Sequence, residues 1–239
     1  MSSSYLFGSK TALEIAVSDW DSNEDLARDI YGDINSWDVS QIEDFSWLFD
    51  EYFDFNSDIS SWDVGNGINF TGMFSAASSF NQDISNWDVS NGKRFDGMFQ
   101  VASSFNQDIG NWDVSNGKSF TLMFAYARSF DQNIRYWSVD EDASLFWMFV
   151  LSDLMNSKQG FSYTPSASDF GLTRITDRDS LDIAIQAWID DESAATEAYG
   201  DINAWDVSQI TDFSYLFEDA TNFNSEISGW DVSNGTNFS

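Results

Sequence analysis

The sequence contains no cysteine and no histidine, and it has only one proline. The absence of cysteine excludes disulfide bonds and thiol catalysis, and the further absence of histidine excludes the common zinc sites and histidine acid–base chemistry. No stretch approaches the roughly 18 apolar residues of a membrane span. The first ten residues lack the basic and apolar regions of a signal peptide, so we expect an intracellular protein or a piece of a longer one.

Basic residues are scarce, with 10 lysines and arginines against 40 aspartates and glutamates, which gives a formal net charge of −30. Nucleic acid and anionic membranes are therefore disfavoured as partners, because both require a basic surface. Such a charge favours solubility and attracts cations or basic partners. The chain is nevertheless 42% hydrophobic and 17% aromatic, so it has enough material to form a core.

What the sequence does have is a repeat of 25 residues, marked by Trp37, Trp62, Trp87, Trp112 and Trp137. The segments 80–90 and 105–115, which read FNQDISNWDVS and FNQDIGNWDVS, differ at one position. A fixed period in the range of about 20–50 residues is typical of a solenoid, in which each repeat stacks on its neighbour.

The pattern within one repeat predicts a strand, a turn and a short helix. Trp-Asp-Val alternates apolar and polar residues, as a strand does. Phe70, Met73, Phe74 and Ala77 have the spacing of one buried helical face, and the pair Asn66-Gly67 marks a turn between the two segments. We therefore expect an α/β repeat fold, a leucine-rich-repeat-like solenoid of short parallel strands and short helices.

Two helical segments precede the repeats and predict N-terminal caps. Possible capping boxes lie at residues 11–14 and 179–182, and an apolar helical pattern follows each of them. The two copies are 168 residues apart, which is not a multiple of 25, so the second copy starts a new array. We expect a first array over residues 1–170, with a cap at about 10–30, repeats at about 30–155 and an end loop and linker at 156–170. Residues 171–239 begin a second array, and the chain stops within a repeat, which predicts a truncated protein.

The motif Phe-Asn-x-x-Ile-Ser-x-Trp-Asp-Val-Ser-Asn followed by Met-Phe-x-x-Ala resembles the repeat of the BspA-like leucine-rich-repeat surface proteins. The resemblance covers roughly residues 30–155 and 199–239, and the cap segments share it. It implies a leucine-rich-repeat-like solenoid with a surface, adhesive or interaction role and no catalytic residues. This chain departs from the family at Gly67, Gly92, Gly117 and Gly235, where a hydrophobic residue is usual.

A column of aspartates follows the tryptophans and is the candidate site. Its members are Asp38, Asp63, Asp88, Asp113, Asp206 and Asp231, and a second column comprises Asp33, Asp58, Asp83, Asp108 and Asp201. Stacked carboxylates about 4.8 Å apart repel each other, so something must offset the repulsion. One possibility is a bridging Ca²⁺ ion, which takes oxygen ligands. The other is that each aspartate accepts backbone N–H bonds in an Asx-turn, with no metal.

The repeated polar residues favour a structural role over catalysis. The asparagines at 56, 81, 106 and 224 predict a buried amide ladder, and the tryptophans predict a core. Catalysis by paired carboxylates needs two distinct groups in one pocket, whereas these are copied in every turn. We therefore expect a non-enzymatic binding or structural module without a cofactor, acting in extracellular or cell-surface adhesion or assembly, with protein partners or by self-association. The alternatives are a Ca²⁺-binding acidic matrix protein and an accessory subunit of a larger complex.

Overall fold

A computed structural model describes residues 4–157, 161–171, 173, 175–218 and 220–239. The chain divides into two compact units, Met1–Gly171 and Leu172–Ser239. The helices and 3₁₀ turns of the first unit are α1 (Lys10–Ser22), α2 (Glu24–Tyr31), η1 (Ile34–Ser36), α3 (Asp153–Ser157) and η2 (Ala167–Asp169), and those of the second are α4 (Arg178–Asp190), α5 (Glu192–Tyr199) and η3 (Ile202–Ala204). Residues 158–160 of the predicted end loop lie outside the described residues.

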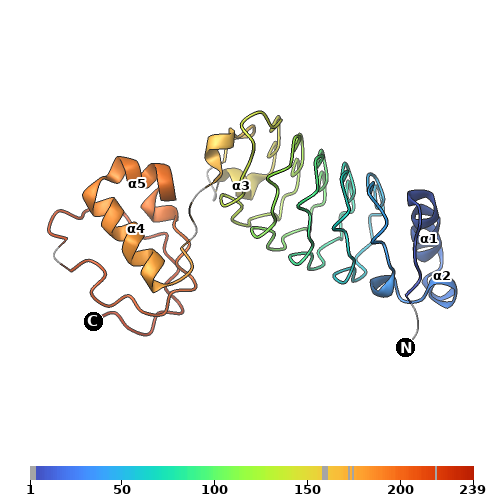
Figure 1. The fold of residues 1–239 in the computed structure, drawn as a ribbon, viewed down its shortest axis with the longest axis horizontal. Helices are drawn as coiled ribbons and strands as arrows, with labels where there is room; N and C mark the ends of the chain where they lie inside the picture. The colour runs from blue at the N-terminus through green and yellow to red at the C-terminus, as the bar shows by residue number, and fades with distance from the viewer. Residues whose placement is uncertain (1–3, 158–160, 172, 174, 219) are drawn as a thin grey trace. The chain divides into compact units, whose positions relative to one another are not determined.

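In each unit a pair of helices precedes the first turn of the repeat, α1 and α2 in the first unit and α4 and α5 in the second (Figure 1). Helix α1 buries Leu13, Ala16, Val17 and Trp20 against the core, and α4 buries the residues at matching positions. The predicted capping boxes are each misplaced by two residues. The side chain of Ser9 caps α1, and Asp177 caps α4 in a capping box with Ser180.

The repeats of the first unit form a row of stacked loops between α2 and α3 (Figure 1). The predicted leucine-rich-repeat-like α/β solenoid is wrong. No β-strand forms among the described residues, and between α2 and α3 there is no α-helix in the part that the structure describes. What remains of a sheet is one parallel bridge per turn, as between Asn69 and Arg94 and between Arg94 and Ser119.

The predicted helix after each Asn-Gly pair is a run of tight turns. The N–H of Met73 donates to the carbonyl of Phe70, three residues earlier, and the N–H of Ala77 donates to Phe74 in the same way. The N–H groups of the alternate residues Gly72, Phe74 and Ala76 donate outward to the next turn, as from Gly72 to the carbonyl of Asp96 (2.8 Å). A helix cannot form because it would need these same N–H groups for its own i→i−4 bonds.

The predicted strand has the expected alternation of burial but lacks a backbone ladder. Trp62 and Val64 are buried and Asp63 is exposed. Side chains bridge this part of neighbouring turns, since Nε1 of Trp62 donates to the carbonyl of Ile34 (2.8 Å) and Nδ2 of Asn66 to that of Ser40 (2.8 Å). The strand is therefore replaced by extended backbone that side chains hold in register.

Stacked aromatic columns fill the interior of the first unit. The rings of Phe70 and Phe95 lie 5.4 Å apart and nearly parallel, as do those of Phe95 and Phe120 at 5.3 Å. A Cβ atom on Gly92 would lie 2.3 Å from Cζ of Phe95 and 2.9 Å from the carbonyl oxygen of Val89. Glycine at this position of the repeat therefore leaves room for the phenylalanine ring three residues later.

Candidate functional site

Each aspartate of the Trp-Asp-Val motif forms an Asx-turn. Its Oδ1 accepts the backbone N–H two residues on, at 3.0–3.1 Å, in the pairs Asp38–Ser40, Asp63–Gly65, Asp88–Ser90, Asp113–Ser115, Asp206–Ser208 and Asp231–Ser233. The second column does the same, in the pairs Asp33–Asn35, Asp58–Ser60, Asp83–Ser85, Asp108–Gly110 and Asp201–Asn203. One carboxylate oxygen of every predicted site residue is thus used to hold a turn.

These hydrogen bonds change the acidity of Asp88 and Asp113. The hydroxyl and the backbone N–H of Ser90 hold the pKa of Asp88 below its usual value, and Ser115 does so for Asp113. The negative charge of Asp113 opposes this effect and raises the pKa of Asp88, so the two carboxylates do interact across neighbouring turns. Hydrogen bonding outweighs the repulsion, since the net shift is downward in both residues.

The structure does not gather the predicted metal ligands into a cage. Among the described residues, no three acidic side chains lie close enough together to hold a metal ion. The aspartates instead remain one per turn, each bonded to its own backbone. Ca²⁺ usually takes six to eight oxygen ligands, so a single carboxylate of the column would not complete such a site.

The predicted asparagine ladder is present between turns. Oδ1 of Asn56 accepts the N–H of Asn81 (2.9 Å), and Oδ1 of Asn81 accepts the N–H of Asn106 (2.9 Å). Glutamines add a parallel set of bonds, such as that from Nε2 of Gln82 to the carbonyl of Asn56 (2.9 Å). The ladder lies at the surface and is not buried, because Asn81 is exposed to solvent.

A surface that the sequence did not reveal lies on the tight-turn segments of the first unit. Large apolar side chains protrude there from three successive turns, and we call this set the outer apolar patch. Its members are the exposed Val101, Tyr126, Phe146, Trp147 and Leu151 and the half-buried Leu122. Phe146 and Trp147 are 53% and 49% exposed although their rings stack on each other at 4.7 Å.

Five members of the outer apolar patch have an unfavourable backbone conformation. The φ angles of Val101, Leu122, Tyr126, Trp147 and Leu151 lie between +54° and +61°. Glycines occupy the position of Leu122 and Trp147 in two earlier turns, where Gly72 and Gly97 have φ of +62° and +59°. The sequence signal for this surface would have been the replacement of glycine by leucine and then tryptophan at one position of the repeat.

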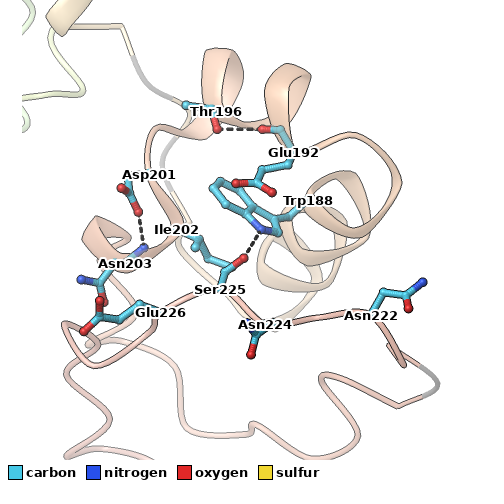
Figure 2. A pocket seen from close by; sticks show the side chains of 10 residues that line it. All are labelled: Trp188, Glu192, Thr196, Asp201, Ile202, Asn203, Asn222, Asn224, Ser225 and Glu226. Atoms are coloured by element: carbon cyan, nitrogen blue, oxygen red, sulfur yellow. Dashed lines mark hydrogen bonds between the residues drawn. The ribbon is translucent and has the colours of Figure 1, made fainter.

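The second unit contains a pocket of about 620 Å³ beside the indole of Trp188, which is drawn in Figure 2. Glu192 and Thr196 of α5 reach it from one segment, Asp201 from the turn before η3, and Glu226 from the next turn of the repeat. Nε1 of Trp188 donates to Oγ of Ser225 (2.9 Å), which fixes the indole as one wall. The pocket is therefore acidic, with an aromatic surface inside it.

Comparison with known proteins identifies the repeat. No curated protein and no solved structure matches the chain. No helix in the described part of the chain is long and apolar enough to cross a membrane. One family matches residues 22–137, 71–162 and 191–239, which together make up most of the sequence. The match shows a repeat protein, but it does not indicate the BspA-like leucine-rich-repeat proteins specifically. The chain belongs to the family described as "Mycoplasma protein of unknown function, DUF285".

Proposed function

We propose that the chain is a non-enzymatic binding module that contacts a protein partner through the outer apolar patch. The observation that carries this proposal is the combination of solvent exposure and left-handed backbone at the same large apolar residues. A left-handed conformation costs an L-residue about 1–2 kcal/mol. Glycine avoids this cost, as at Gly72 and Gly97. Trp147 in place of glycine thus adds strain while its side chain stays exposed, and Leu122 in place of glycine adds strain while its side chain is only partly buried. A partner that covers them would supply the missing gain.

The first turn carries a tryptophan at the same position of the repeat, Trp47, which is 53% exposed and packs against the next turn. A Cβ atom on Gly72 would lie 2.2 Å from Cε3 of Trp47, so the Trp47 ring rests directly on that glycine. Trp147 is 49% exposed and stacks on Phe146, which is itself half exposed. Exposed apolar groups that gather over several turns are typical of protein interaction sites.

The charge of the chain supports a basic partner. With a net charge of −30, copies of this chain repel each other, whereas a positively charged protein is steered toward it. We place this binding at a cell surface or outside the cell, in adhesion or assembly. The resemblance of the Trp-Asp-Val-Ser repeat to BspA-like surface proteins supports that location.

The test uses two purified proteins. A photo-crosslinking amino acid at Tyr126 captures the partner, which is then purified and its affinity measured by calorimetry. The variant Tyr126→Ser/Trp147→Ser should bind at least about tenfold more weakly, because aromatic residues dominate interface energies. Phe53→Ser is the matched control, since Phe53 is 57% exposed and lies in an early turn, and it should bind as the unchanged chain does.

Two results would contradict the proposal. Equal affinity of the patch variant and the control would remove the patch from the interface. Sedimentation that shows a dimer of the unchanged chain, lost in the patch variant, would assign the patch to self-association instead. The salt dependence of the association rate checks the charge argument, because screening slows electrostatic steering.

A further inference from the structure

We propose that the pocket beside Trp188 binds a guanidinium group, because the guanidinium of Arg28 occupies the matching place in the first unit. The two caps correspond residue by residue at an offset of 168. Trp188, Glu192 and Asp201 thus match Trp20, Glu24 and Asp33, whereas Arg28 is replaced by Thr196. This site lies in the second unit and is separate from the outer apolar patch.

In the first unit, Arg28 is held by three groups. Its guanidinium carbon lies 4.9 Å from the centre of the Trp20 ring, in a cation–π contact. Its Nη2 donates to Oε1 of Glu24 at 2.5 Å, and its Nη1 donates to Oδ2 of Asp33. These two hydrogen bonds raise the pKa of Arg28, as expected for a cation between two carboxylates.

The tryptophan that contacts Arg28 in the first unit is held in the same way in the second unit. The indole N–H of Trp20 donates to Ser57 at 3.1 Å, and that of Trp188 donates to Ser225 at 2.9 Å. The centres of the Trp188 and Trp205 rings lie 5.7 Å apart with an angle of 88° between the ring planes. The rings of Trp20 and Trp37, at the matching positions of the first unit, lie 5.7 Å apart at 89°. The indole that would receive a cation is therefore fixed in the same way in both caps.

Because Thr196 replaces the arginine, Trp188, Glu192 and Asp201 have no cation between them from this position. Its Oγ1 donates to the carbonyl of Glu192 (2.7 Å) in its own helix (Figure 2), and so turns toward the backbone of α5. The pocket of about 620 Å³ lies where the arginine side chain would run, and the described residues that line it include Glu226 as a third carboxylate but no lysine or arginine. A guanidinium is planar, stacks on indole and donates to two carboxylates at once, so it fits this set better than an ammonium does.

The experiment follows the indole N–H signal of Trp188 in the full chain by two-dimensional NMR, with the signal assigned from Trp188→Phe. The probe is N-acetylarginine N-methylamide, and the citrulline analogue, which has the same shape without the charge, is the control. We expect a saturable shift with the arginine probe in the millimolar range and none with citrulline. The lysine analogue should bind at least about threefold more weakly.

Two substitutions then exchange the residue at this one position between the two caps. Thr196→Arg supplies the pocket with its own guanidinium and should weaken probe binding at least about tenfold. Arg28→Thr should open a second site, at which the Trp20 indole signal now responds to the probe. Glu192→Gln removes one carboxylate and should weaken binding about threefold to tenfold. In every variant, the remaining indole signals report whether the fold is intact.

The outcomes separate the possibilities. Unchanged binding in folded Thr196→Arg, or an equal response to citrulline, would overturn the proposal, and equal affinity for lysine would overturn the preference for guanidinium. A Gly-Gly-Arg-Gly-Gly peptide identifies the source of the ligand. Binding about tenfold tighter than the free probe indicates an arginine side chain of a protein, and equal binding indicates a small guanidinium compound. None of these results depends on the outer apolar patch, so either proposal can fail alone.

Discussion

The indole nitrogen of Trp112 donates a hydrogen bond of 3.1 Å to the backbone carbonyl of Ile84, 28 residues earlier in the chain. Trp112 is 4% exposed, so the bond lies inside the stack. The same bond joins Trp62 to Ile34, Trp87 to Ile59, Trp137 to Ile109 and Trp230 to Ile202. The tryptophan of the motif therefore both fills the core and ties its turn to the preceding one.

Trp112→Phe should lower the free energy of unfolding by about 1–3 kcal/mol beyond the loss of ring area, because it leaves a buried carbonyl without a donor. Urea unfolding followed by circular dichroism measures this loss. Trp147→Phe is the control, since Trp147 lies half exposed at the surface, and it should change stability by less than about 0.5 kcal/mol. Equal losses in the two variants would contradict the role of the indole N–H.

Gly92→Ala should destabilise the first unit by about 1–3 kcal/mol, because its Cβ would overlap the Phe95 ring. Gly8→Ala is a matched substitution in the same unit, where a Cβ would meet nothing within 4 Å, and it should be close to neutral. The midpoints of thermal unfolding of both variants are the measurement. A neutral Gly92→Ala would mean that the ring can move aside.

Acid should weaken the Asx-turns. The pKa of Asp113 is lowered in the folded chain by the hydroxyl and the backbone N–H of Ser115, so its stabilising contribution is complete above the unfolded pKa of about 3.9 and is lost as the pH falls through the folded value. Asp113→Asn keeps an acceptor oxygen but not the charge. The stability difference between the unchanged chain and Asp113→Asn should therefore shrink below about pH 4, as measured by urea unfolding at several pH values.

Ser115→Ala provides the control for this titration. It removes the hydroxyl but keeps the backbone N–H, so the acid-dependent loss of stability should become smaller without disappearing. If Asp113→Asn showed the same acid dependence as the unchanged chain, the titrating group would have to lie elsewhere.

Ca²⁺ and Mg²⁺ should raise the thermal midpoint equally at matched ionic strength, because the described aspartates are engaged singly with their own turns. Both ions then act only by screening the charge of −30. The comparison needs EDTA as a metal-free reference. A rise specific to Ca²⁺ would instead favour the Ca²⁺-binding alternative, since a ligand that binds only the folded state stabilises it by an amount that grows with the ligand concentration relative to its Kd.

The sequence predicted which side chains are buried better than it predicted the backbone. Phe70, Met73, Phe74 and Ala77 are all buried, as their spacing indicates, but they lie on overlapping turns instead of a helix. Spacing reports which face is apolar and not where the N–H groups bond. The donation from Gly72 to the next turn is therefore invisible in one repeat, because it depends on the neighbouring repeat.

The surface features were missed for a different reason. Leu122 and Trp147 differ from Gly72 and Gly97 at one position of the repeat, and Thr196 differs from Arg28 at one position of the cap. A search for what repeats passes over such differences. Their meaning emerges only when the structure supplies the φ angles and the pocket that surround them.

The side-chain bonds between turns also constrain how this protein can change in length. Asn81 and Asn106 each bond to the asparagine one repeat earlier, and Nδ2 of Asn91 and Asn116 reaches back 26 residues. Inserting or deleting a single residue between them would move each donor away from its acceptor in that turn. Gains and losses should therefore occur in whole blocks of 25 residues, so that the gene lengthens or shortens by 75 nucleotides at a time.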